Sequence, residues 1–195
     1  MKPALEVKEF SRETWSDFEA LFGKHKGVRG GCWCTFHRCT STQFDRMTRD
    51  ERKELQKELA QEGHGYGLLV YDARTPVAWC RFGPAEGFPR YDRGRAYGKL
   101  ALAADQVPQW RISCLFADKH RRREGLAKFA LHSAITIIGK RGGGVVEAFP
   151  LDVPGTTHPQ YTGSIKMYKR EGFREVARLG KNMVLMRRIV QADEA

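Results

Sequence analysis

The stretch "HRRREGLAKFALHSAI", residues 120–135, combines positive charge, a glycine and a helical apolar pattern. Arg121, Arg122 and Arg123 precede Gly125, and the apolar side chains that follow recur at helical spacing. A helix N-terminus presents unpaired backbone N–H groups and the positive end of the helix dipole. Cations at this position favour a bound anion, and a glycine lets a phosphate approach the backbone closely. The stretch therefore predicts a pyrophosphate site, with a solvated run of surface arginines as the alternative.

The charge of the whole chain also favours an anionic partner. The 195 residues include 34 Lys and Arg against 23 Asp and Glu, which gives a net charge of +11. This balance suits a phosphorylated ligand, a nucleic acid or an acidic surface and does not choose among them.

Composition and cysteine usage bound the class of protein. No apolar run is long enough to span a membrane, and the first residues lack the apolar core of a signal peptide. Five cysteines, an odd number, do not indicate a disulfide framework. We expect one domain over residues 1–195, located in the cytoplasm.

The hydrophobic periodicity predicts a mixed α/β chain around one central sheet. Strands are expected at 4–10, twice within 67–83, and at 110–117, 145–151, 175–180 and 183–190. Helices are expected at 11–23 with Ser11 as N-cap, at 48–63 with Thr48 as N-cap, at 124–144 and at 163–173. Residues 84–108 show no clear period and are expected to form a long loop or a short helix.

Two motifs identify a family resemblance. The chain contains neither a P-loop nor a dinucleotide fingerprint. The six residues 122–127 (Arg-Arg-Glu-Gly-Leu-Ala) match the pattern Gln/Arg-x-x-Gly-x-Gly/Ala, which resembles the acyl-CoA pyrophosphate loop of the GNAT superfamily of N-acetyltransferases. The stretch "YTGSIKMYKREGF", residues 161–173, resembles the family's later helix, Asn-x-x-Ala-x-x-Leu-Tyr-x-x-x-Gly-Phe. Tyr168, Gly172 and Phe173 match directly, whereas Tyr161 stands in place of the usual Asn.

The segments "GGCWCTFHR" and "VAWCRFG" further resemble a bacterial branch of the superfamily with a Cys-Trp-Cys loop. The resemblance implies an α+β fold, a mixed and mostly antiparallel sheet flanked by helices, whose fourth and fifth strands splay apart. Acetyl-CoA would lie in the gap as co-substrate. The residues expected to contact it are Leu115, Phe116 and Ala117 along the pantetheine, and Arg122, Arg123, Glu124, Gly125, Leu126, Ala127 and Lys128 around the pyrophosphate.

The resemblance also implies a reaction. A primary amine would attack the thioester directly, and a backbone N–H of the strand at 115–117 would polarise the thioester carbonyl, as in an oxyanion hole. Tyr168 would protonate the departing thiolate. Neither a metal nor a covalent intermediate is required.

The sequence does not identify the base that must keep the amine neutral. Glu147, on the expected strand at 145–151, is the first candidate by position and type. Asp152, His158 and His120 are further candidates.

Cys32, Cys34, His37 and Cys39 lie within eight residues, which raises the question of a zinc site. Cys-x-Cys is tighter than the usual Cys-x-x-Cys spacing, and no second pair follows, so zinc is not favoured. Trp33, Cys34 and Phe36 are instead expected to form a wall of the acceptor pocket. The alternative is that the segment packs in the core, since free cysteines are commonly buried.

The sequence thus predicts a cytoplasmic acetyl-CoA-dependent N-acetyltransferase that is a monomer or homodimer. Its acceptor would be an amine on a small molecule, a peptide or a protein, with no membrane partner. An enzyme that acetylates aminoacyl-tRNA and a regulatory domain that binds acyl-CoA without turnover are the alternatives. A protein that only binds nucleic acid comes last, because no helix-turn-helix, zinc finger or stacking motif occurs.

Overall fold

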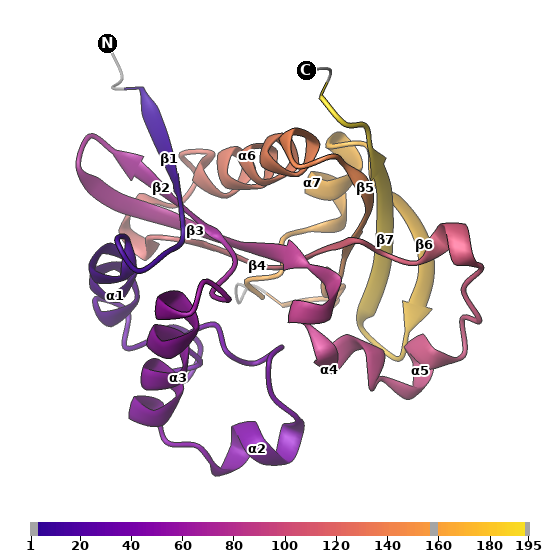
Figure 1. Cartoon of the computed structure of the whole chain (residues 1–195), viewed down its shortest axis with the longest axis horizontal. Coiled ribbons are helices and arrows are strands. Elements are labelled where there is room, and N and C mark those ends of the chain that lie inside the picture. The colour runs from indigo at the N-terminus through magenta and orange to yellow at the C-terminus, as the bar shows by residue number, and fades with distance from the viewer. Residues whose placement is uncertain (1–3, 157–159, 194–195) are drawn as a thin grey trace.

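A seven-stranded sheet forms the centre of the protein, as the computed structural model of residues 4–156 and 160–193 shows (Figure 1). The strand order is β1-β2-β3-β4-β5-β7-β6, and every neighbouring pair is antiparallel except β4 and β5. The strands are β1 (Leu5–Glu9), β2 (Leu68–Asp72), β3 (Thr75–Pro84), β4 (Trp110–Ala117), β5 (Gly144–Ala148), β6 (Arg174–Leu179) and β7 (Met183–Val190). The predicted mixed, mostly antiparallel sheet is confirmed.

Helices cover both faces of this sheet because the buried strands are apolar on both sides. In β2, Leu68 and Val70 face the long helix α6, whereas Leu69 and Tyr71 face α1. Figure 1 shows α6 and α7 on one side of the sheet and α1 and α3 on the other. The helices are α1 (Trp15–Gly23), α2 (Ser41–Arg46), α3 (Arg49–Gln61), α4 (Pro89–Asp92), α5 (Arg95–Gly98), α6 (Leu126–Lys140) and α7 (Ile165–Arg170), with single 3₁₀ turns at η1 (Ala85–Gly87), η2 (Ala104–Gln106) and η3 (Lys119–Arg121).

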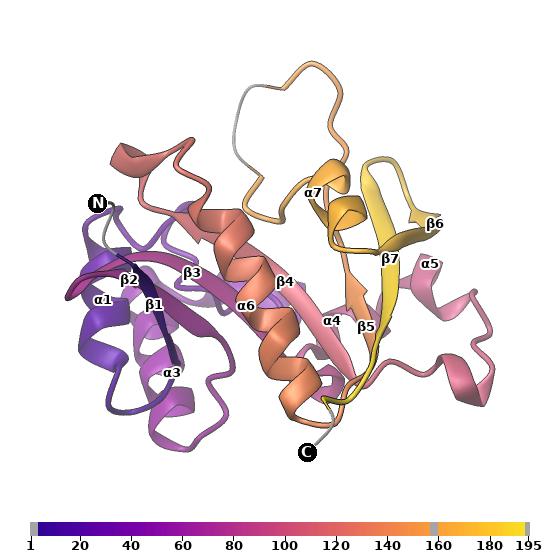
Figure 2. The same ribbon diagram turned by 90° about the horizontal axis from the view of Figure 1, so that it is seen from above.

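The expected splay of the fourth and fifth strands is present. β4 pairs with β5 only between Trp110–Ile112 and Val146–Ala148, and Figure 2 shows the two strands diverging beyond that point. The divergence begins at a bulge, because Arg81 and Phe82 of β3 lie opposite Cys114 and Ile112, which leaves Ser113 without a partner. Beyond the bulge, one edge of β4 faces the chain segment that joins β5 to α7.

Most predicted elements agree with the structure within a few residues. Helix α3 has Thr48 as N-cap, and a capping box with Glu51 fixes its start as predicted. Helix α1 starts at Trp15 with Thr14 as N-cap, not at Ser11, whose hydroxyl instead accepts the Glu13 N–H. The segment 84–108 contains several short helical turns, and helix α2 was not predicted. In the part of the chain that the structure describes, no helix combines the length and apolar character that crossing a bilayer requires.

Candidate active site

The N-terminus of α6 has the local structure that an anion site needs. Gly125 is the N-cap, with φ of +81° in the left-handed region, and no side chain caps the helix. Helices α2, α3 and α7 each have a side-chain cap. A Cβ added at Gly125 would find no protein atom within 4 Å. The first N–H groups of this 15-residue helix therefore have no side-chain cap, and the space beside Gly125 is open.

The three arginines before this helix divide into two kinds. The Arg121 guanidinium contacts Asp72 at 2.5 Å and Glu124 at 2.6 Å, so it fastens the loop to β2. Arg122 and Arg123 are exposed and have no ion-pair partner among the described residues. Two free guanidinium groups thus lie beside the uncapped helix, as the pyrophosphate prediction requires.

The three pantetheine residues lie on the free half of β4. Leu115 and Ala117 pack toward α6, and Phe116 is fully buried on the α1 side. The N–H of Leu115 donates to the carbonyl oxygen of Tyr161 at 2.7 Å. A thioester carbonyl bound to that N–H would therefore replace the Tyr161 carbonyl.

Tyr168 lies on α7 beside this half of β4. A Cβ added at Gly163 would come within 2.8 Å of the Tyr168 ring and 2.9 Å of Leu115, so the two side chains share one small space. The Tyr168 ring contacts Phe173 edge-on, with 5.2 Å between ring centroids. Its hydroxyl is buried and has no hydrogen-bond partner among the described residues. Burial raises the pKa of Tyr168 well above its ordinary value.

A cavity of about 330 Å³ lies against the bulge of β4. Its walls are mainly aromatic and sulfur-containing, and no carboxylate of the described residues lines it. The lining aromatic side chains are Phe22, Phe36, Phe44, Tyr91, Phe149 and Tyr161. Cys32, Cys34, Cys114 and Met183 supply the sulfur atoms. These walls suit an apolar ligand rather than a polycation.

Two of the three residues predicted to form the acceptor wall (Trp33, Cys34 and Phe36) line the cavity. These two are Cys34 and Phe36. Trp33 is 7% exposed, packs behind the wall against Phe22, and is not a lining residue. The sequence did not indicate Ser113, Cys114 or Tyr91, because they reach the cavity through the bulge of β4 and the turn at α4.

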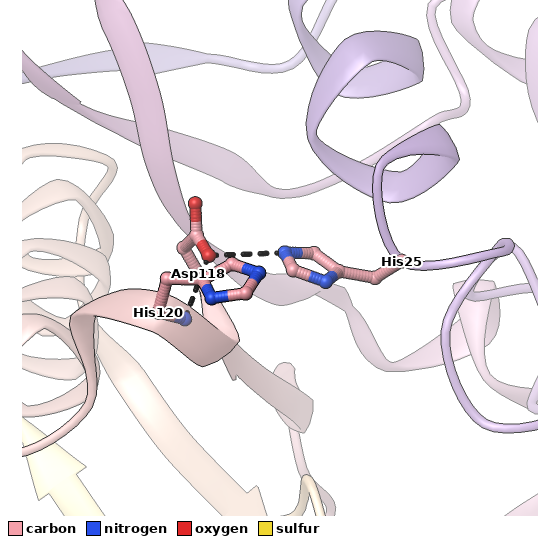
Figure 3. A group of neighbouring side chains, drawn as sticks. All are labelled: His25, Asp118 and His120. Atoms are coloured by element: carbon pink, nitrogen blue, oxygen red, sulfur yellow. Dashed lines mark hydrogen bonds and ion pairs between the residues drawn. The ribbon is translucent and has the colours of Figure 1, made fainter.

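One group of described residues brings three candidate metal ligands together: His25, Asp118 and His120, whose ligand atoms all lie within 4.8 Å of one another (Figure 3). Asp118 already accepts from Lys24 Nζ at 2.6 Å and lies 3.1 Å from His25 Nε2. Burial raises the pKa of Asp118, but its contacts with Lys24 and the His120 N–H outweigh this and lower it to about 2. Because the Lys24 ammonium occupies this carboxylate, the arrangement is better suited to tie the end of α1 to β4 than to hold a cation.

The candidate bases that the structure describes have contacts of their own. Glu147 is fully buried and accepts from Tyr97, Arg111 and Arg187 at 2.7 to 3.2 Å. Asp152 forms an ion pair with Arg178 at 2.8 Å, and His120 lies in the turn after β4. His158 lies outside the described residues. None of the three described candidates lines the cavity.

Comparisons with known proteins show which structures share this fold. No protein-family model matches the chain, and no curated protein matches its sequence. Among solved structures, a mosquito arylalkylamine N-acetyltransferase-like protein aligns with 95% of this chain and all of its own, at a TM-score of 0.59 and 9% identity. A protein from Desulfovibrio desulfuricans, named as a GNAT-family acetyltransferase, aligns over 96% of this chain and 99% of its own, at a TM-score of 0.56 and 14% identity.

A third solved structure is a Salmonella typhimurium protein, named as an acetyltransferase and solved with its cofactor acetyl-CoA. It aligns over 98% of this chain and 96% of its own, at a TM-score of 0.52 and 16% identity. At these identities the likeness concerns the fold. The chain therefore has the fold of the GNAT acetyltransferases along almost its whole length.

Proposed function

We propose that this protein is an N-acetyltransferase that uses acetyl-CoA as co-substrate and a primary amine as acceptor. The observation that carries the proposal is the course of β4. Its free half runs from the cavity wall at Ser113 and Cys114 to the turn that leads into the uncapped helix α6. One strand thus connects an apolar pocket with an anion site, which is the layout that an acyl-CoA and its acceptor need.

The residues fit the cofactor at both ends. The open N-terminus of α6, Gly125 and the exposed Arg122 and Arg123 supply N–H donors and charge for a pyrophosphate. The edge of β4 at residues 115–117, which β5 does not cover, supplies backbone groups for the pantetheine arm once the Tyr161 carbonyl leaves the Leu115 N–H. When bound, acetyl-CoA supplies an acyl group already activated as a thioester.

Tyr168 is proposed to protonate the departing thiolate. Its ring lies close to the side chain of Leu115, the residue whose N–H is proposed to bind the thioester carbonyl, and its hydroxyl has no partner among the described residues. Burial keeps the proton on the phenol until a charge develops nearby. The same apolar surroundings raise the proton affinity of a thiolate formed there, which favours the transfer.

The proposed acceptor is a primary amine on a small molecule with an apolar or aromatic body. Aromatic side chains and no carboxylate line the cavity in the described structure, so its walls offer apolar contact and no partner for a polyamine. Direct attack needs a neutral amine, and hence a base that reaches this cavity. The sequence pattern named Glu147 for that role, but Glu147 does not line the cavity, and its oxygens accept from two arginines and a tyrosine.

Calorimetric titration of the protein with CoA tests the proposal. We expect the double variant Arg122→Gln/Arg123→Gln to lose at least about tenfold in affinity, because two charge-assisted contacts are removed. The double variant Arg93→Gln/Arg95→Gln is the matched control, since it removes the same charge from two exposed arginines near α4 and α5. An equal loss of CoA affinity in the two double variants, or no CoA binding to the parent protein, would refute the assignment of the anion site.

A further inference from the structure

Arg81 presents an unusual charge balance in the core. Its side chain is fully buried in β3, and it forms no ion pair with a carboxylate of residues 4–156 or 160–193. Its Nη1 donates to Gln56 Oε1 and to the Cys34 carbonyl oxygen, both at 3.1 Å, while Nε and Nη2 have no hydrogen-bond partner in the described part of the chain. A buried guanidinium is costly unless an anion lies close to it.

The sulfur of Cys34 is placed to be that anion. The Trp79 indole N–H donates to Cys34 Sγ at 3.2 Å, and the Cys114 thiol is a second donor to the same sulfur. Burial raises the pKa of Cys34, but the Cys114 hydrogen bond, the Arg81 charge and the Trp79 N–H together outweigh it. The pKa of Cys34 is lowered to about 7.

The other ionisable groups around Cys34 do not compete for this role. The groups whose charges act on the Cys34 thiol, or on which it acts, are Arg81 and Cys80 of β3, Cys114 of β4, Tyr91 of α4 and Cys32 of its own loop, and among these Arg81 carries the positive charge. Arg29 and His37 line the same cavity. Burial, followed by the charge of Arg81, lowers the pKa of His37 to about 3, so its imidazole is a weaker base than the Cys34 thiolate. Burial raises the pKa of Cys32, Cys80 and Tyr91, and the hydrogen bond to Cys34, followed by burial, raises that of Cys114.

Cys34 also lines the cavity in which the acceptor is proposed to bind. Ser113, which lines the same cavity, is 2% exposed, and its hydroxyl has no partner among the described residues. Tyr161 is a third lining residue, and its carbonyl oxygen accepts a hydrogen bond from the Leu115 N–H. An unused hydroxyl and a stabilised sulfur anion therefore line one cavity, and another of its lining residues accepts from the N–H proposed to hold the thioester carbonyl.

We propose that the Cys34 thiolate is the general base that takes the proton from the acceptor amine. The inference rests on the proposed function and assigns the role of the base, since no carboxylate among the described residues lines the cavity. Ser113 Oγ would accept a second N–H of the amine and hold its nitrogen toward the thioester.

The step balances in atoms and protons. As the bond between the amine nitrogen and the acyl carbon forms, Cys34 takes one N–H proton and becomes a thiol. The carbon–sulfur bond of acetyl-CoA breaks, and the CoA thiolate takes a proton from Tyr168, which recovers it from solvent. Cys34 then returns its proton to solvent. The products are an acetylated amine and CoA, and no acetyl group resides on the protein.

The first test measures the thiolate itself. The full-length protein is alkylated with iodoacetamide between pH 5 and pH 10, and the Cys34 peptide is quantified by mass spectrometry. We expect a rate midpoint near pH 7 for Cys34, and a midpoint at least one pH unit higher in Trp79→Phe, which keeps an aromatic ring and removes the N–H donor. Cys39, whose pKa burial raises, is the internal control. An unshifted midpoint near pH 9 in the parent protein would overturn the proposal.

The second test measures catalysis with an amine that the parent protein acetylates. Cys34→Ser should lose at least about 100-fold in kcat/KM and lose the rise of kcat/KM with pH near pH 7, because general base catalysis typically contributes that much. Cys39→Ser, at a buried cysteine outside the cavity, should keep both. CoA affinity should be unchanged in either variant.

The outcomes separate this inference from the proposed function. A Cys34→Ser variant within about threefold of the parent, or an acetyl group found on the Cys34 peptide by mass spectrometry without acceptor, overturns the base assignment alone. A parent protein that binds no CoA and releases none with any amine overturns the proposed function as well.

Discussion

Replacing Glu147 with Gln should destabilise the protein strongly and leave the chemistry nearly unchanged. Arg111 on β4, Glu147 on β5 and Arg187 on β7 are direct neighbours across three strands. Both glutamate oxygens are occupied by these guanidinium groups and by the Tyr97 hydroxyl. The carboxylate is fully buried, so the isosteric amide removes its charge without changing its volume.

The contacts of the two arginines set the expected magnitude. Arg187 has no second carboxylate in the described part of the chain, whereas Arg111 keeps Asp92 at 2.5 Å. Removing one partner of a buried pair costs about 3 to 5 kcal/mol of stability. Because Arg111 keeps its Asp92 contact, we expect a loss at the lower end, about 3 kcal/mol. For a chain of this size that corresponds to a fall in Tm of about 6 to 12 °C.

Thermal and urea unfolding followed by circular dichroism provide the assay, with Asp152→Asn as control. The Asp152–Arg178 pair has 40% and 57% of its side chains exposed, so its loss should cost less than about 1 kcal/mol. Below the Tm of the variant, Glu147→Gln should keep kcat within about threefold of the parent, because Glu147 does not reach the cavity. A stable variant that has lost about 100-fold or more in kcat would refute this reasoning and make Glu147 the base.

Three further predictions follow from the site. Gly125→Val should weaken CoA binding at least about tenfold by calorimetry, whereas Gly142→Val, which has the same kind of positive φ and equally open surroundings, should cost similar stability and no affinity. Tyr168→Phe should lower kcat at least about tenfold with unchanged CoA affinity, and because its hydroxyl is buried without a partner in the described structure, Tm should not fall. Cys34 has a folded-state pKa of about 7 against 9.0, so the unfolded chain holds its proton more tightly. Between pH 7 and pH 9 the free energy of unfolding should therefore rise by about 2 kcal/mol more in the parent protein than in Cys34→Ser, and this gain is lost as the pH falls through 7.

The fold was predictable where a local signal and a tertiary need coincide. β4 has the predicted bounds because its eight residues form an apolar run, which is a strong β signal. The same length fits the buried middle of the sheet. α3 starts where Thr48 and Glu51 form a capping box. α2 escaped prediction although Thr40 and Gln43 form the same kind of box, because it has six residues and buries none of them.

The site was predictable only in the parts that one segment builds. The Arg-rich turn, Gly125 and the start of α6 form a continuous stretch, so a motif describes them. The surroundings of Cys34 come instead from positions 79, 81 and 114, and they meet it only through the pairing of β3 with β4 and the bulge at Ser113. The sequence around Glu147 made it a plausible base. The two arginines that bind its carboxylate come from other strands, and only the pairing of β5 with β4 and β7 places them beside it.

The most direct test of the central claim is an acetyl transfer assay with acetyl-CoA and a panel of aromatic, alkyl, polyamine and peptide amines. Free CoA is measured with a thiol reagent, and the acetylated amine is identified by mass spectrometry in the same reaction. We predict release of CoA that depends on the acceptor and matches the acetylated product one to one, with apolar and aromatic amines preferred. Binding of acetyl-CoA without acetylated product from any amine would contradict the claim and identify an acyl-CoA-binding domain without transferase activity.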